Sequence, residues 1–323
     1  MKQRILIKSY GFFGDILFSI PAVIMLAQSR PADDITFAIG FPQPYEIVKT
    51  SLRHIPNVQL IVSEIDDPRV RVNESGYDQI FEMPECNRQD PPHIQYCRYL
   101  IPEIPNVYPK FVLSLPEEAV TRCRAILNRN AQQVFRIGMV ANWDRCTVKY
   151  SDDYIQRIRI SSSSDASAYL DHRFEIEHRR DIPKIINAAA QGIKDKIQKD
   201  VQIIPLGFPY GVSQRNQSFN SISTYTDTAA LIRNCDIVVG PEGGMTNLAA
   251  GLNVPTIITT DFMWGLYGPY GLMQQLDDPQ LGPIKFIPQR FPYAKHKSLQ
   301  PAITDEEISN EIIQFATQSS LYH

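Results

Sequence analysis

The chain has 323 residues, a length that suggests two domains, and 43% of its residues are hydrophobic, enough for sizeable cores. Its formal net charge of −3 provides no basic field for a polyanion, so stable binding of nucleic acid or of an anionic membrane is not expected.

The first predicted element is a strand followed by a glycine loop and an apolar helix. The strand covers residues 4–8, the loop is Ser-Tyr-Gly-Phe-Phe-Gly-Asp, and the helix covers residues 16–26. Pro21 falls inside the helical pattern, which predicts either a kink or a helix that starts properly near Ser19. The loop places Asp15 at the carboxyl end of a first strand, where open α/β sheets bind ligands. Helix capping alone would also explain Asp15.

Neither an export signal nor a transmembrane segment is expected. The first strand is too short for the apolar part of a signal peptide, and the apolar helix is too short to span a bilayer. The five cysteines are scattered, with no Cys-x-x-Cys pair, which argues against a disulfide framework or a zinc site. Together these features favour a cytoplasmic location.

Strands and helices continue to alternate, which implies a parallel sheet with right-handed crossovers. Further strands are expected at residues 35–39, 58–62 and 77–81, with helices at 45–53 and 117–128. The stretch from Pro84 to Pro116 is rich in proline and hard to build as one regular element, so we interpret it as an excursion over a cleft between two domains.

A strand at residues 135–140 is expected to open the second domain, followed by a loop at 141–149. A helix at 182–197 has isoleucine and alanine at helical spacing, which predicts that it packs on the sheet. The next strand, 201–206, ends at Gly207, which we include among the candidate binding residues.

The stretch from Val238 to Pro255 contains the strongest candidate for a binding site. An apolar run at 236–239 predicts a buried parallel strand, and a helix is expected from Met245 to Ala250. The turn between them is Gly-Pro-Glu-Gly-Gly, where unpaired helix amides, the helix dipole and glycines that allow close approach favour an anion. Glu242 is placed to accept hydrogen bonds from a sugar or ribose hydroxyl. The alternative is a plain strand-to-helix turn that needs flexible residues. After it, a strand at 256–260 and a last helix with a capping box at 304–307 are expected.

Two of these segments resemble the motifs of glycosyltransferase family 9, the heptosyltransferase-like enzymes. The first is the loop at residues 9–15 with Ser-Ile-Pro-Ala at 19–22, and the second runs from Val239 to Ala250 with Val-Pro-Thr at 254–256. A segment at 224–236, which resembles the helix that leads into the second motif, also fits. The middle of the chain fits only in outline.

The resemblance implies an α/β protein of the GT-B fold, in which two Rossmann-like parallel-sheet domains face a central cleft. The acceptor-side domain would comprise residues 1–130 and the nucleotide-sugar-binding domain residues 131–303. The helix at 304–323 would pack back toward the first domain.

The resemblance also implies which residues meet the donor. The family's loop after the first strand of the second domain carries hydroxyl and lysine groups, for which Asn142, Thr147 and Lys149 are the candidates here. The remaining donor-binding candidates are Gly14, Gly207, Glu242, Gly243, Gly244, Met245, Thr246 and Asn247. The chain departs from the family pattern at Glu242 for Asp, Gly243 for Thr or Ser, and Asn247 for His, so neither the sugar nor the nucleotide is specified.

The implied reaction moves a sugar from a nucleotide-diphosphate donor to a hydroxyl of a glycan or another acceptor. Asp15 would act as general base. The amides at 243–245, helped by Lys149, would stabilise the departing diphosphate. No metal or other cofactor is expected, because the four Asp-Asp pairs do not form an Asp-x-Asp after a strand.

Other functions remain open. The departures from the family pattern would also suit a non-catalytic relative that binds a nucleotide or a sugar. A transferase with an unusual acceptor, such as modified DNA or a protein, is a further alternative. A nucleotide-dependent oxidoreductase is disfavoured, because the chain lacks Gly-x-Gly-x-x-Gly and an acidic residue at the end of the second strand.

Overall fold

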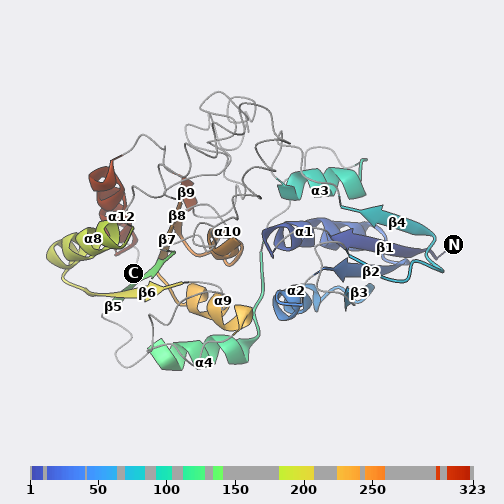
Figure 1. The fold of residues 1–323 in the computed structure, drawn as a ribbon, viewed down its shortest axis with the longest axis horizontal. Helices are drawn as coiled ribbons and strands as arrows, with labels where there is room; N and C mark the ends of the chain where they lie inside the picture. The colour runs from blue at the N-terminus through green and yellow to red at the C-terminus, as the bar shows by residue number, and fades with distance from the viewer. Residues whose placement is uncertain are drawn as a thin grey trace, which may run out of the picture.

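The computed structural model describes residues 2–9, 13–40, 42–63, 70–83, 92–103, 112–127, 134–140, 182–206, 224–240, 244–258, 296–298 and 304–320. These residues form an α/β protein with two parallel sheets, the architecture that the resemblance implied (Figure 1). Among the helices described, none is both long and apolar enough to cross a membrane.

The first sheet has the strand order β3-β2-β1-β4, and all its pairings are parallel. Its strands are β1 (Arg4–Ser9), β2 (Asp34–Ile39), β3 (Val58–Val62) and β4 (Gln79–Glu82). Helices α1 (Phe13–Ser29), α2 (Tyr45–Leu52) and α3 (Pro92–Leu100) pack into the core that holds the Ile5 and Ile7 side chains of β1. The alternate residue Leu6 packs on the other face, against Ala38 and Val70.

Helix α1 begins at Phe13 and continues through Pro21, so the alternative of a helix that starts near Ser19 is wrong. Proline cannot donate the hydrogen bond to the carbonyl four residues earlier, which weakens an isolated helix. Here Ile16, Leu17 and Ile20 are each at most 1% exposed, and α1 packs against the first sheet and against α2, α3 and α10 (Gly244–Gly251). Burial of these side chains therefore holds the helix together across the proline.

Helix α3 lies inside the proline-rich stretch that we expected to be irregular. It begins at Pro92, and proline is compatible with the first turn of a helix because the amide there has no intrahelical partner. Tyr96, Cys97 and Leu100 are buried in the core shared with α1. Packing on α1 therefore makes a helix where composition alone predicted a loop.

The second sheet has the order β6-β5-β7-β8-β9, again with parallel pairings throughout. Its strands are β5 (Val134–Met139), β6 (Asp200–Pro205), β7 (Ile237–Gly240), β8 (Thr256–Ile258) and β9 (His296–Ser298). The helices beside it are α8 (Ile182–Ile197), α9 (Tyr225–Arg233) and α10. β9 was not expected, because its three residues carry no apolar pattern.

The last helix, α12 (Asp305–Ser320), packs against α8, and its expected packing back toward the first domain stays a prediction. Its buried residues Ile308, Ile312 and Ala316 join the core of the second sheet together with Ile186 of α8. The Ser309 hydroxyl also donates to the Ile185 carbonyl at 3.1 Å. The buried residues of α12 therefore pack with α8 and with the second sheet.

Helix α4 (Glu117–Leu127) lies against α9, beside the second sheet, although the sequence division at residue 130 assigns it to the first domain. The Arg122 guanidinium pairs with the buried carboxylate of Asp227. That pairing raises the pKa of Arg122, through the hydrogen bond first and the charge second. The domain limits stay a prediction.

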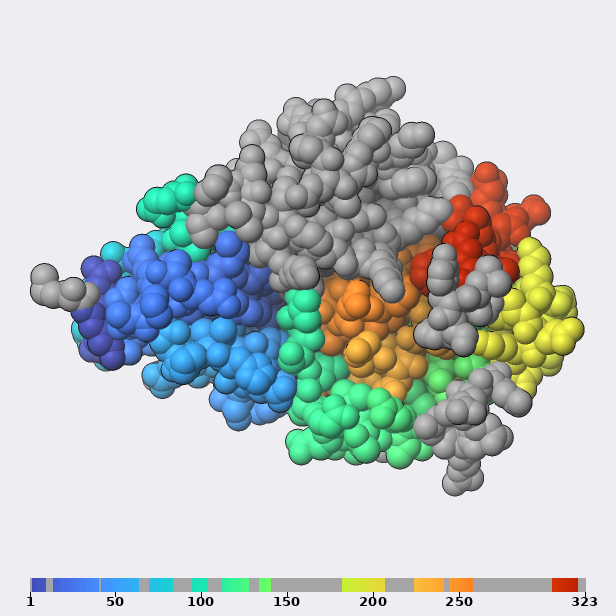
Figure 2. Space-filling model, turned by 180° about the vertical axis from the view of Figure 1, so that it is seen from behind, coloured from blue at the N-terminus to red at the C-terminus, as the bar shows by residue number. Residues whose placement is uncertain are grey.

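The segment just before α4 is bonded to both halves and lies between them (Figure 2). The Leu113 amide donates to the carbonyl of Gly251, the last residue of α10, at 2.8 Å. The next amide, that of Ser114, donates to the Ser51 hydroxyl of α2 at 3.0 Å. Leu113 is itself buried in a core that runs without a break from the first sheet to α9 and α10. We call residues 112–116 the strap.

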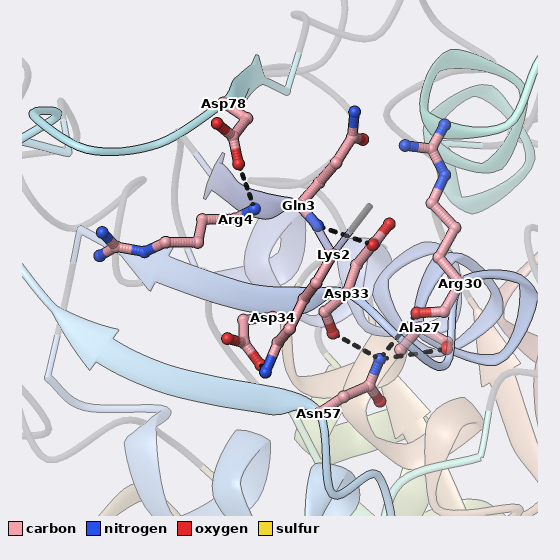
Figure 3. A network of polar contacts seen from close by, with 9 residues as sticks. All are labelled: Lys2, Gln3, Arg4, Ala27, Arg30, Asp33, Asp34, Asn57 and Asp78. Carbon is pink, nitrogen blue, oxygen red and sulfur yellow. Dashed lines mark hydrogen bonds and ion pairs between the residues drawn. The ribbon is translucent and has the colours of Figure 1, made fainter.

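A network of polar contacts closes the amino-terminal edge of the first sheet (Figure 3). The Asn57 side-chain amide donates to the carbonyls of Ala27, Arg30 and Asp33 at 3.1–3.3 Å. The backbone amide of Gln3 donates to the Asp33 carboxylate at 2.9 Å. These contacts fix the end of α1 and the start of β2, and they lie at the edge opposite the one where ligands bind in such sheets.

Candidate active site

The first turns of α1 and α10 meet between the two sheets, and this is where predicted site residues come together (Figure 1). α1 follows β1 and α10 follows β7, each a central strand of its sheet. A Cβ added to Gly14 would lie 3.7 Å from the Asn247 side-chain nitrogen. Two predicted residues that are far apart in the sequence therefore lie next to each other.

Asp15 lies in the first turn of α1 and is partly exposed. It is the third residue of the helix and does not precede it, so it does not occupy the position of a simple N-cap. The helix dipole favours a negative charge in this turn. Asp15 therefore lies in a turn where the helix dipole favours a negative charge, next to Gly14.

The end of β1 is tied to α1 by two buried serines. The Ser9 and Ser19 hydroxyl oxygens are 3.2 Å apart, and the Ser19 hydroxyl donates to the Ile16 carbonyl at 2.7 Å. Both serines are 0% exposed. This pair is a feature that sequence analysis missed, although two serines flanking an apolar helix start were a visible signal.

Helix α10 is positioned by a close approach between the ends of β7 and β5. A Cβ on Gly240 would lie 2.4 Å from the Val140 Cβ and 2.8 Å from the Val140 carbonyl oxygen. No side chain fits there, so glycine at 240 allows β7 to end against β5 and fixes where the turn to α10 begins. At Gly240, the first residue of this turn, glycine is therefore needed because the neighbouring strand end leaves no room for a side chain.

The predicted residues of α10 are placed in different ways. Gly244 begins the helix, where its amide and that of Met245 have no partner within the helix. The Met245 side chain is buried in the core, so only its backbone is available to a ligand. Thr246 and Asn247 are buried as well, at 1% and 5% exposure.

Six predicted donor-binding residues lie outside the described residues: Asn142, Thr147, Lys149, Gly207, Glu242 and Gly243. Their roles stay predictions. The ends of β5, β6 and β7, which precede these residues, are described and lie side by side in one parallel sheet.

A second group of charges lies on the face of the first sheet opposite α1. Lys8 is 4% exposed, and its ammonium nitrogen lies 2.5 Å from carboxylate oxygens of both Glu74 and Glu82. Lys8 is the penultimate residue of β1, so these ion pairs hold the end of the strand from the far side of the sheet. The sequence signal for them was a lysine in an otherwise apolar strand.

The described cysteines do not offer a nucleophile. Burial raises the pKa of the Cys97 thiol to about 12 and, with help from the Asp227 charge, that of Cys123 to about 11. Burial also raises the pKa of Cys235. All three are therefore protonated at neutral pH. No group of three or more potential metal ligands occurs within the part of the chain that the structure describes.

Comparison with solved structures shows a shared fold. The structure matches a glycosyl transferase family 9 protein from Veillonella parvula DSM 2008 with a TM-score of 0.58 and 12% identity, over 98% of this chain and 97% of that one. It matches ADP-heptose LPS heptosyltransferase II of E. coli with a TM-score of 0.55 and 13% identity, over 99% and 100% of the two chains. The iron-containing dodecameric glycosyltransferase TibC of enterotoxigenic E. coli H10407 matches with a TM-score of 0.52 and 13% identity, over 100% of this chain and 80% of that one.

No protein-family model and no curated protein sequence matches the chain. At these low identities the structural matches establish the fold alone. That fold is the GT-B arrangement that the two sequence motifs implied.

Proposed function

We propose that the protein is a glycosyltransferase that moves a sugar from a nucleotide-diphosphate donor to the hydroxyl of a glycan or another acceptor. One observation carries the proposal: the first turns of α1 and α10, which come from different sheets, meet at Gly14 and Asn247. This meeting puts a carboxylate-bearing turn beside a helix N-terminus suited to anions. The shared fold of enzymes in this class supports the same reading.

The donor diphosphate is proposed to bind at the start of α10. The amides of Gly244 and Met245 are the described donors, and Gly243 and Lys149 would add an amide and a cation. Fixed donors of this kind stabilise charge that develops on a leaving group, and each is worth about 3–4 kcal/mol in other enzymes. Glu242, Asn142 and Thr147 remain proposed contacts to the sugar or nucleotide, as does Gly207.

Asp15 is proposed as the general base. Its carboxylate would accept the proton of the acceptor hydroxyl while that oxygen bonds to the anomeric carbon and the bond from that carbon to the diphosphate breaks. The motivation is its position in the turn that faces α10. We further propose that no metal is needed, because helix amides and a lysine suffice to carry the diphosphate charge. The cytoplasmic location stays a prediction.

The test begins with binding. Purified protein would be titrated by calorimetry with ADP, UDP and GDP, and then with ADP-, UDP- and GDP-glucose as probes. We expect saturable binding of at least one nucleotide, and slow release of free nucleotide from the matching glucose donor when water acts as acceptor. Absence of binding by every nucleotide would overturn the proposal. Binding without release in the presence of added glycan acceptors would favour the non-catalytic relative.

A further inference from the structure

We infer that Ser9 and Ser19 are positioning residues that hold Asp15 in place, an inference that rests on the proposed role of Asp15 as general base. The two serines connect the last residue of β1 to the second turn of α1. Asp15 lies between them in sequence, four residues before Ser19, which is about one helical turn. Their hydrogen bond closes the segment of chain that carries Asp15.

The direction of this hydrogen bond follows from counting protons. A serine hydroxyl has one proton to donate. The Ser19 proton is given to the Ile16 carbonyl at 2.7 Å, so in the 3.2 Å contact the Ser9 hydroxyl is the donor and Ser19 accepts. The result is a directed chain from the Ser9 hydroxyl through Ser19 to the carbonyl of the residue that follows Asp15.

Burial makes this chain rigid. Both serines are 0% exposed and lie beside the fully buried Ile7, Ile16 and Leu17. A hydroxyl in such surroundings has no water to replace a lost partner, so a broken bond leaves an unsatisfied polar group. The bonded arrangement is therefore strongly favoured over any that lets the first turn of α1 shift along β1.

Further contacts hold the end of β1 and the first turn of α1 in place. Lys8, the neighbour of Ser9, is held on the far face of the sheet by Glu74 and Glu82. Gly14, the neighbour of Asp15, lies against Asn247 of α10. The serine chain is the link between these two contacts, because it joins the strand end to the helix turn.

Helix α1 also supplies a matched control. The Ser29 hydroxyl donates to the Leu26 carbonyl at 2.8 Å, the same bond from residue i to residue i−3 that Ser19 makes to Ile16. Ser29 lies at the other end of the helix, and it is exposed to solvent more than Ser19. Replacing Ser29 removes an equivalent helix hydrogen bond without touching the turn that carries Asp15.

The experiment compares Ser9→Ala, Ser19→Ala, the double variant and Ser29→Ala in the full chain. Hydrogen–deuterium exchange would follow amides 13–18, and nucleotide release would be measured from the glucose donor that the binding test selects. We expect faster exchange at 13–18 and a loss of kcat of about 10- to 10²-fold with KM for the donor unchanged, because small displacements of a reacting group are this costly. The double variant should lose no more than either single variant, and Ser29→Ala should match the wild type. Ser9→Thr, which keeps the hydroxyl, should restore kcat.

Several results would overturn the inference. Unchanged exchange at 13–18 in both serine variants would do so even if no glucose donor is hydrolysed, since it needs no substrate. Equal losses in Ser19→Ala and Ser29→Ala would point to helix stability alone. If Asp15→Asn leaves nucleotide release unchanged, Asp15 is not the base, and the positioning role of the serines is refuted with it. If Asp15→Asn lowers kcat but the serine variants do not, only the positioning role is refuted. Thermal unfolding would check folding, and Ser9→Cys would replace a Ser9→Ala that does not fold.

Discussion

At the scale of single residues, the proposed role of Asp15 as general base has helix capping as its alternative. It is the third residue of α1, partly exposed, and its neighbour Gly14 touches α10. An acidic residue in the first turn also stabilises a helix start, so capping fits this position as well. The same position suits a base that must reach a donor bound at α10.

Replacing Asp15 by asparagine tests this role. Asparagine keeps the size of the side chain and its ability to accept hydrogen bonds at a helix start, but it cannot take a proton at neutral pH. We expect kcat for transfer to fall about 10²- to 10⁴-fold with nucleotide affinity and thermal stability retained. Steady-state kinetics with calorimetry on the same preparation would measure both. Near wild-type turnover would leave Asp15 with a helix-stabilising role only.

Which site residues the sequence can identify depends on the kind of signal they carry. Asp15 and Asn247 belong to motifs with glycines next to a strand end, and such motifs can be recognised without a structure. The Ser9–Ser19 pair and the Lys8 ion pairs cannot, because each depends on which side of a strand faces which helix and on partners distant in sequence. The linear pattern shows two serines flanking the start of an apolar helix and a lysine in an apolar strand, but not the partners of these residues.

At the scale of elements, Gly240 is the residue at which β7 ends against Val140. Its backbone lies so close to Val140 that an added Cβ would be 2.4 Å from the Val140 Cβ and 2.8 Å from its carbonyl oxygen. Since a strand backbone in a sheet cannot move aside easily, we expect Gly240→Ala to reduce the free energy of unfolding by about 1–3 kcal/mol. Chemical denaturation would measure the loss. Gly192→Ala is the contrast, because there the nearest atom is the mobile Cδ1 of Ile313, and a similar loss in both variants would contradict the argument.

The start of α12 should respond to acid. The Thr304 backbone amide and hydroxyl both donate to the Glu307 carboxylate, at 2.7 and 2.8 Å, and lower the pKa of that group below its ordinary value of 4.5. A carboxyl whose pKa is lowered by folding stabilises the folded state above its unfolded pKa, and this contribution is lost as the pH falls through the folded value. We therefore expect the amides in the first turn of α12 to lose protection against exchange below about pH 4, where protection is the intrinsic rate divided by the observed rate.

The control for this acid response is Glu307→Gln, which cannot ionise. Its exchange at residues 305–308 should vary less with pH than that of the wild type once intrinsic exchange rates are divided out. If the two proteins show the same pH dependence in this turn, the capping box does not account for it.

The sequence located most strands and helices because buried parallel strands are short apolar runs and their helices repeat apolar residues at helical spacing. β3 and α8 have the expected limits, residues 58–62 and 182–197. The misses have physical causes. α3 depends on packing against α1, and β9 has no apolar pattern.

At the scale of the whole molecule, the proposed base lies on α1 and the proposed donor site on α10, so the proposed reaction needs elements from both halves of the molecule. We expect transfer to persist in excess EDTA, since the proposed diphosphate site uses helix amides and a lysine. Nucleotide release would be measured with chelator and after adding back magnesium or manganese. Full loss in EDTA with recovery on adding either ion would refute the metal-independent mechanism and point to a carboxylate pair such as Asp152 with Asp153 as a ligand.

The strap bears on where this chain can be joined to a related chain to make a chimeric protein. Gene fusions between two-domain enzymes are usually joined at a boundary that few contacts cross. Here the chain passes from the first half of the molecule to the second in the strap, before α4. Helix α4 packs with α9 through Arg122 and Asp227, and the strap is bonded to Ser51 on one side and to Gly251 on the other. A chimera joined near residue 130 would separate α4 from its partner, whereas a junction before Val112 would inherit α4, α9 and α10 as one unit.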